Sequence, residues 1–170
     1  VTAMGSLDGR KPVLRSGARP GDVVAVNGRL GWAAAGLAVL GRGFRSPRVL
    51  VEAQRVPQVS YGTGAAAAGA GATSMIDISD GLLADLGHVA RASGVLIDLR
   101  QDAFEVAEPL QAVAAATGAD PYTFIFSGGD DHALAATFPS ADFLPEGWLV
   151  VGQVERADHD QIGVLVDGAV

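Results

Sequence analysis

The stretch from Ser74 to Leu86, SMIDISDGLLADL, changes its pattern of apolar residues halfway along. Its first half is a short apolar run, which is typical of a buried strand, and we expect that strand over residues 73–78. From Asp80 onward the apolar residues recur at helical spacing, so a helix is predicted over residues 80–93, with Gly94 ending it. A chain built around such a unit belongs to a fold class that contains both strands and helices.

The rest of the chain continues this mixture. Further strands are predicted at residues 23–26, 95–99, 122–126, 133–138, 148–154 and 162–166. Further helices are predicted at residues 31–40, 62–72 and 104–117, the second of these as an alternative to a flexible linker. Residues 42–62 are expected to be irregular, with Pro47 and Pro57 as breakers. Because the strands come singly and in hairpins between helices, we predict an α+β fold with a mixed sheet and helices packed against it.

Length and composition restrict the class of protein. The 170 residues are enough for one domain with its own core, and the absence of cysteine excludes disulfides, thiolate metal sites and cysteine nucleophiles. No apolar run approaches the roughly 18 residues that span a bilayer, and no secretory signal is visible, so we expect no membrane association and a cytosolic location. The formal net charge is −7 without a basic stripe, which is not the pattern of a nucleic-acid-binding protein.

The aspartates of the opening stretch are the first candidate site. Either Ser79 or Asp80 is a good N-cap for the predicted helix, which gives one of the polar residues a structural role. Asp77 lies inside the predicted strand, and alternation along a strand directs it to the same side as Ser79. Asp80 follows at the helix start, where anions are favoured. Two close carboxylates repel each other unless a cation lies between them, and Mg²⁺ is a suitable ion because it prefers oxygen ligands.

Two other segments are weaker candidates. The segment SGGDDH at residues 127–132 has two glycines that allow close approach to a ligand, and its Asp130 and Asp131 could accept hydrogen bonds or reach a metal. On sequence alone, an ordinary hairpin loop with solvent-facing acidic residues is the better explanation. The segment RSGARPGD at residues 15–22 carries Arg15 and Arg19, which suit a phosphate group or, alternatively, a solvated surface turn. No histidines stand at metal-ligand spacing and no serine has a nucleophile-elbow context, so covalent catalysis is poorly supported.

Taken together, four segments resemble the thiamine-monophosphate kinase family: RSGARPGD, GRLGWAAAGLAVL, MIDISDGLLADLGHVARASG and FSGGDDHAL. This family is grouped with aminoimidazole-ribonucleotide synthetase, selenophosphate synthetase and the hydrogenase-maturation dehydratase. The resemblance covers most of the chain and implies a C-terminal (PurM-like) domain with a largely antiparallel sheet. Residues 1–170 would then be a single domain of a longer, two-domain kinase, and the chain's start without methionine at a strand end fits that expectation. The absent N-terminal domain would form a homodimer.

The resemblance also implies an activity and a set of site residues. The activity is Mg²⁺-assisted phosphoryl transfer from ATP to thiamine monophosphate, giving thiamine diphosphate. By position, Asp77 and Asp80 match Mg²⁺-binding aspartates, while Arg15 and Ser79 match residues that contact ATP. Asp130 matches an acidic substrate contact, but the family usually reads GGEDYEL where this chain reads GGDDHAL.

Two alternatives remain beside this interpretation. One is another ATP-using synthetase of the same superfamily, resembling aminoimidazole-ribonucleotide synthetase, with a different acceptor. The other is a non-catalytic domain that serves ligand binding or assembly. On the kinase interpretation we expect the 170 residues alone to be inactive, because the family's N-terminal domain contributes further metal-binding aspartates and much of the nucleotide pocket.

Overall fold

A computed structural model describes residues 2, 4–7, 9–158 and 161–169 of the chain. The strands form one six-stranded sheet in the order β2-β4-β1-β5-β3-β6, in which the β3–β6 pair is parallel and the other pairs are antiparallel. The strands are β1 (Val23–Asn27), β2 (Ser74–Ile78), β3 (Val95–Leu99), β4 (Ala133–Phe138), β5 (Leu149–Arg156) and β6 (Gly163–Val166). The helices are α1 (Trp32–Gly41), α2 (Arg48–Arg55), α3 (Thr63–Gly69), α4 (Leu82–Ser93), α5 (Glu108–Thr117) and α6 (Pro121–Ser127). Short 3-10 turns are η1 (Arg15–Gly17), η2 (Gln101–Ala103) and η3 (Ala141–Phe143). The predicted α+β class with a mixed, largely antiparallel sheet is confirmed.

One face of the sheet packs against α4, and its strand residues alternate accordingly. In β2, Ile76 and Ile78 are buried on this face, whereas Asp77 between them is exposed on the other. Leu82 and Leu86 of α4 are almost fully buried against the same core, as expected from their spacing of four residues. Burying each of these side chains contributes about 1.5–3 kcal/mol, so the position of α4 beneath the sheet is strongly determined.

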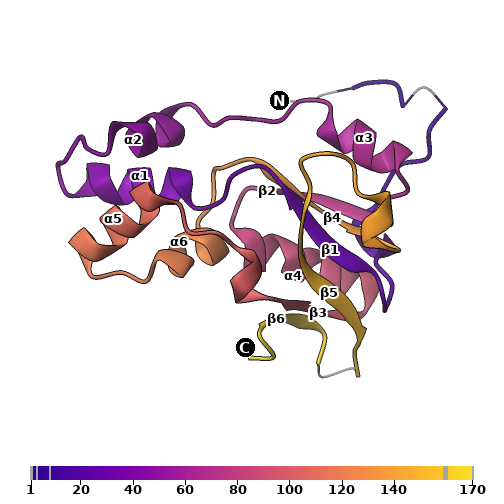
Figure 1. Ribbon diagram of the computed structural model, residues 1–170. Helices are drawn as coiled ribbons and strands as arrows, with labels where there is room; N and C mark the ends of the chain where they lie inside the picture. Colours follow the sequence, from indigo (N-terminus) through magenta and orange to yellow (C-terminus); the bar gives the residue numbers. More distant parts are fainter. Residues whose placement is uncertain (1, 3, 8, 159–160, 170) are drawn as a thin grey trace.

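The opposite face of the sheet is covered only in part. Phe138 is fully buried there and its ring meets that of Trp148 edge-to-face, with centroids 5.6 Å apart. Ala67 of α3 completes this smaller cluster, and Figure 1 shows α3 lying apart from the other helices, above the sheet. The exposed side of β2 is therefore open enough to present polar residues to a ligand.

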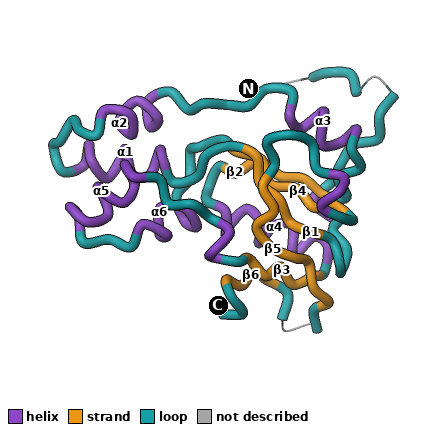
Figure 2. Tube along the Cα trace, in the orientation of Figure 1, coloured by secondary structure: helices purple, strands orange, loops and turns teal. Residues whose placement is uncertain are grey.

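The helices α1, α2, α5 and α6 form a helical group beside the sheet, on the left of Figures 1 and 2. Helices α1 and α2 pack closely because Gly36 has no side chain: a Cβ added there would overlap with the carbonyl oxygen of Leu50. Among the described residues, no helix is long and apolar enough to cross a membrane.

Two predicted segments differ from the structure. Residues 122–126 are predicted as a strand, yet they lie in α6. Pro121 occupies the first helical turn, and a carboxylate oxygen of Asp120 accepts a hydrogen bond from the amide of Tyr122 at 2.9 Å. The rings of Tyr122 and Phe126, one helical turn apart, stack with centroids 5.8 Å apart.

The other difference is α2, which lies within the segment expected to be irregular. Pro47 stands at the N-cap of this helix, where its missing N–H costs nothing, so it begins the helix rather than excluding one. Leu50 and Val51 are buried against α1, and this packing supplies the stability that an isolated eight-residue helix lacks.

Candidate functional site

The corner between β2 and α4 holds three of the predicted site residues. Asp77 lies near the end of β2, and Ser79 and Asp80 follow it before α4 begins; the side chains of both aspartates are exposed. The hydroxyl of Ser79 donates a hydrogen bond to Oδ1 of Asp80 at 3.0 Å. The predicted N-cap role of Ser79 or Asp80 is wrong, since Gly81 is the N-cap of α4 and makes no side-chain cap.

Asp85, in the first turn of α4, holds this corner in place. Its Oδ2 atom accepts hydrogen bonds from the backbone amides of both Ser79 and Asp80, each at 2.9 Å. Asp85 is only 4% exposed, so the two amides stabilise a carboxylate that would otherwise be costly to bury. Asp85 is not among the site residues predicted from the sequence. An available signal was its position three residues after Leu82, on the apolar stripe of the helix.

The glycine-rich turn after α6 lies directly against the same corner. The amide of Asp130 donates a hydrogen bond to the carbonyl oxygen of Ser79 at 2.9 Å. Gly129 has to be a glycine here, because a Cβ at this position would overlap with that carbonyl oxygen. Asp130 itself has a positive φ of 64° and an exposed side chain. The turn links α6 to β4 rather than two strands, so the expected hairpin loop is wrong, but its acidic residue does lie beside Ser79.

Asp131, the next residue, is directed inward rather than toward a ligand. Its Oδ1 atom accepts a hydrogen bond from the amide of Ala33 at 2.9 Å, in the first turn of α1, and its buried Oδ2 atom has no hydrogen-bond partner among the residues that the structure describes. Burial raises the pKa of the Asp131 carboxyl above its ordinary value, and the nearby amides and the charge of Arg29 oppose that rise. This residue therefore anchors the glycine-rich turn to α1.

Arg15 lies on η1, next to the edge strand β2. Arg15 and Asp77 line the same open hollow of about 680 Å³, together with apolar side chains that include Met75 and Leu134. The hydroxyl of Ser93, at the end of α4, donates a hydrogen bond to the carbonyl oxygen of Arg15 at 2.9 Å. The structure thus brings Arg15 and Asp77 together, whereas Ser79, Asp80 and Asp130 are not among the residues that line this hollow.

In the remainder of the RSGARPGD segment, the side chain of Asp22 accepts hydrogen bonds from groups of the protein rather than facing a ligand. Oδ2 of the buried Asp22 accepts hydrogen bonds from the amide of Arg19 at 3.0 Å and from the hydroxyl of Thr73 at 2.6 Å. Asp22 is therefore a structural residue of this turn, and the exposed Arg19 does not line the hollow that contains Arg15.

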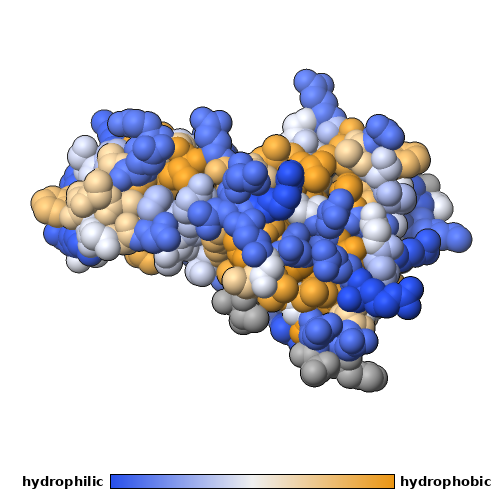
Figure 3. Space-filling view, turned by 60° about the horizontal axis from the view of Figure 1, so that its bottom comes forward, coloured by the Kyte–Doolittle hydropathy of each residue, from blue (hydrophilic) through white to orange (hydrophobic). Residues whose placement is uncertain are grey.

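A second cavity, of about 230 Å³, lies where the helical group meets the sheet. Trp32, Phe104 and Leu149 form part of its wall, and the guanidinium of Arg29 lies 4.4 Å from the centroid of the Trp32 ring. Figure 3 shows apolar surface between the helices on the left and the sheet on the right. None of the site residues predicted from the sequence lines this cavity.

The oxygen atoms of the β2–α4 corner suit Mg²⁺ in one specific way. Within the part of the chain that the structure describes, no group of three or more His, Asp or Glu residues is arranged to hold a metal ion. Mg²⁺ is, however, commonly bound by one or two carboxylates, with water and substrate phosphates completing its coordination. Asp77 and Asp80 supply two exposed carboxylates, which is the number that such a shared site uses and too few for a site made of protein atoms alone.

Residues 19–164 match the family described as AIR synthase related protein, C-terminal domain, and the chain belongs to this family. The similar curated proteins carry a more specific name. A thiamine-monophosphate kinase from Mycobacterium tuberculosis is 52% identical over 99% of this chain and 49% of its own length. One from Corynebacterium glutamicum is 41% identical over 98% of the chain and 51% of its own length. The resemblance seen in the sequence is thereby confirmed.

A similar solved structure, AaThiL complexed with AMPPCP and TMP, has a TM-score of 0.80 and 32% sequence identity, and it covers 93% of this chain and 52% of its own chain. The fold predicted from the resemblance is confirmed by this match. The chain spans about half the length of the curated relatives that it matches.

Proposed function

We propose that this chain is the C-terminal part of a thiamine-monophosphate kinase, which transfers a phosphoryl group from ATP to thiamine monophosphate and gives thiamine diphosphate and ADP. The observation that carries the proposal is the 52% identity to a thiamine-monophosphate kinase over nearly the whole chain. The complex of a similar structure with AMPPCP and TMP supports the same pair of ligands.

The proposed roles of the residues come from the resemblance to the kinase family, and their places in the structure support them. Asp77 and Asp80 would hold Mg²⁺, since both are exposed carboxylates at the end of β2 and the start of α4. Arg15 would bind phosphate oxygens of ATP, because it lines the same hollow as Asp77 and presents a fixed positive charge. Ser79 would contact ATP, and Asp130, whose amide bonds to Ser79, would contact thiamine monophosphate.

Such a site needs positioning and charge neutralisation more than it needs a general base, because the accepting phosphate oxygen is already anionic. The Arg15 guanidinium supports this by neutralising negative charge on the phosphates, and Ser79 and Asp130 orient the two substrates. Held by Asp77 and Asp80, Mg²⁺ would supply positive charge that neutralises the negative charge developing during transfer. A general base or a covalent nucleophile is therefore not required for this chemistry.

The chain would act together with an N-terminal domain that supplies further metal ligands and a homodimer interface. We propose that the 170 residues alone bind Mg²⁺-ATP weakly and turn over nothing. The homodimer is a prediction from the resemblance, and sedimentation of the longer protein would check it. The cytosolic location is a prediction from the sequence.

A product assay tests the proposal directly. The longer protein and the 170-residue chain are each incubated with Mg²⁺, ATP and thiamine monophosphate, and thiamine diphosphate is quantified. The acceptor of a purine-biosynthetic synthetase, offered with ATP in parallel, tests the closest alternative. We expect thiamine diphosphate from the longer protein only. Turnover of the other acceptor, or comparable activity of the 170 residues alone, would contradict the proposal.

A further inference from the structure

We propose that Asp85 is a positioning residue that sets the geometry of Ser79 and Asp80 for Mg²⁺-nucleotide binding. The inference rests on the proposed function, and it concerns a residue that would touch neither metal nor substrate. Asp85 would act only through the two backbone amides that donate hydrogen bonds to its carboxylate.

The contacts of Ser79 show how narrowly this corner is defined. Its amide donates to Asp85, its carbonyl oxygen accepts from the amide of Asp130, and its hydroxyl donates to Asp80. Every polar group of Ser79 therefore has a partner within the corner. One of these three contacts is made with Asp85 itself, and on this proposal the other two depend on the backbone orientation that Asp85 fixes.

A single carboxylate oxygen that accepts hydrogen bonds from two consecutive amides, those of Ser79 and Asp80, restrains both peptide planes at once. Those planes determine the direction in which the side chains of Ser79 and Asp80 leave the backbone. Asp85 can hold them because it belongs to a twelve-residue helix whose buried face is locked into the core. Its place in the first turn of that helix also favours a negative charge.

A purely structural role, in which Asp85 only stabilises the start of α4, is the competing explanation. Both explanations predict a loss of stability when the carboxylate is removed. Only the positioning role predicts that metal-nucleotide affinity falls more than it falls in an equally destabilised variant. A matched control is therefore needed.

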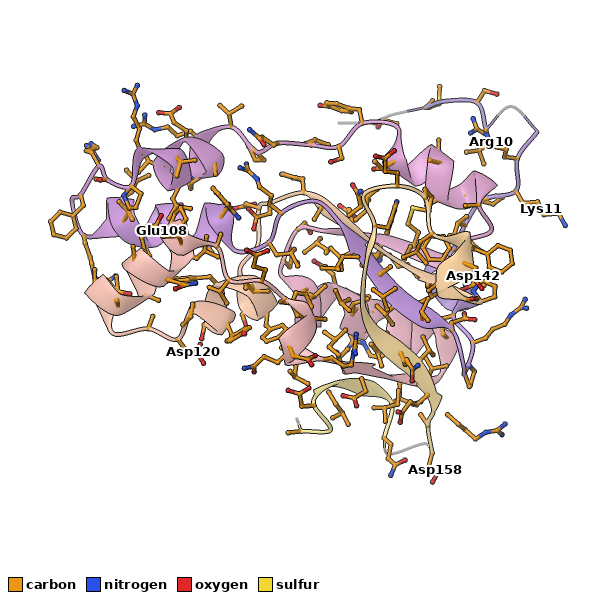
Figure 4. The ribbon with its side chains drawn as sticks, viewed as in Figure 1. Arg10, Lys11, Glu108, Asp120, Asp142 and Asp158 are labelled. Carbon is orange, nitrogen blue, oxygen red and sulfur yellow. The ribbon has the colours of Figure 1, made fainter. Side chains whose placement is uncertain are left out.

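Asp120 offers a control for the loss of a helix-start hydrogen bond, although it is exposed and accepts one amide hydrogen bond rather than two, so the melting temperature of each variant is measured alongside. Its carboxylate also accepts a hydrogen bond from a backbone amide at the start of a helix, that of Tyr122 at 2.9 Å. The helix that it caps is α6 and not α4. Figure 4 shows Asp120 at the outer edge of the helical group, pointing away from the sheet. Its removal deletes the same type of hydrogen bond without touching the β2–α4 corner.

The experiment compares Asp85→Ala, Asp85→Asn and Asp120→Ala in the longer protein. Calorimetry measures the Kd for Mg²⁺-AMPPCP, and hydrogen exchange measures protection of the Ser79 and Asp80 amides. We expect Asp85→Ala to raise the Kd at least tenfold, the range typical for loss of a residue that orients a metal ligand, and to accelerate exchange at both amides. Asp85→Asn keeps an oxygen acceptor and should show a smaller rise, while Asp120→Ala should leave Kd and exchange at these amides unchanged.

The outcomes separate the inference from the function on which it rests. If the unaltered protein binds Mg²⁺-AMPPCP and Asp85→Ala binds it equally well, the inference is overturned and the proposed function stands. An equal loss of affinity in Asp120→Ala would also overturn it, because stability alone would then explain the effect. If Asp85→Ala does not fold, unchanged affinity and exchange in Asp85→Asn overturn the inference. Failure of the unaltered protein to bind would overturn the proposed function and this inference together.

Discussion

The backbone amide of Asp130 donates a hydrogen bond to the carbonyl oxygen of Ser79 at 2.9 Å, and this contact joins the two segments that carry most of the predicted site residues. One segment follows β2 and the other precedes β4, and these strands are antiparallel neighbours with Ile78 opposite Ala133. The pairing of the strands thus brings the start of the segment after β2 next to the end of the segment before β4. The hydrogen bond then fixes the proposed substrate contact beside the proposed nucleotide contact.

The close approach of Gly129 to Ser79 leads to a first prediction. In Gly129→Ala the new Cβ would overlap with the Ser79 carbonyl oxygen, so the turn has to shift. We expect the free energy of unfolding to fall by about 1–3 kcal/mol and the KM for thiamine monophosphate to rise. Gly69→Ala in α3 is the control, because an added Cβ there has no heavy atom within 4 Å. Equal stability and equal KM in both variants would contradict the prediction.

The three-residue separation of the exposed Asp77 and Asp80 leads to a second prediction, which concerns stability without metal. If the two carboxylates repel each other, Asp77→Asn should raise the melting temperature slightly when Mg²⁺ and nucleotide are absent. Asp77 is exposed, so no packing is lost in this variant. Thermal melts in a chelating buffer measure the effect. A strongly destabilised Asp77→Asn would instead indicate that the residue has a purely structural role.

The buried carboxyl of Asp131 leads to a third prediction, which concerns pH. Because burial raises the pKa of Asp131 in the folded state, ionisation costs more in the folded than in the unfolded chain. The contribution of this group to stability is therefore greatest below its ordinary pKa and is lost as the pH rises through the raised value. We expect the stability of the unaltered protein relative to Asp131→Asn to be lower at pH 7 than at pH 4, as measured by denaturant unfolding. A difference that grows with pH would contradict this.

The packing of α1 against α2 leads to a fourth prediction. Gly36→Ala would place a Cβ against the carbonyl oxygen of Leu50 and force the two helices apart, so we expect a loss of about 1–3 kcal/mol in unfolding free energy. Gly41→Ala at the end of the same helix has open space around the new Cβ and should be neutral or stabilising by up to about 1 kcal/mol. Chemical denaturation of the two variants tests the difference, and similar values for both would contradict it.

The strands and helices that were predicted correctly are those whose secondary structure is determined by the residues within the element itself. The strand over Ser74–Ile78 and the helix that ends before Gly94 follow from local periodicity and from a glycine that adopts a left-handed conformation, with φ of 68°. Helix α6 could not be predicted in this way, because its alternating aromatic residues imitate a strand. Asp120 and Pro121 are the residues that favour the helix, as its N-cap and its first turn. They occupy only two positions, whereas the strand-like pattern covers five.

The site was predictable to the extent that one segment carries it. Asp77, Ser79 and Asp80 are close in sequence and therefore close in space. The roles of Asp85 and Asp131 were not predicted, because each depends on a hydrogen bond that only the folded backbone reveals. Asp85 bonds back to amides that precede its helix, and Asp131 bonds to the amide of Ala33, which is distant in sequence. A buried carboxylate at a core-facing position is the signal that points to such a role.

The central claim is that Asp77 and Asp80 bind the Mg²⁺ ion that accompanies the phosphates of ATP. The most direct measurement is the Mg²⁺ concentration that gives half-maximal formation of thiamine diphosphate by the longer protein, compared with Asp77→Asn and Asp80→Asn at saturating ATP. The account predicts that each variant needs at least about tenfold more Mg²⁺, which corresponds to about 1.4 kcal/mol of lost binding free energy. An unchanged Mg²⁺ requirement in both variants would contradict it.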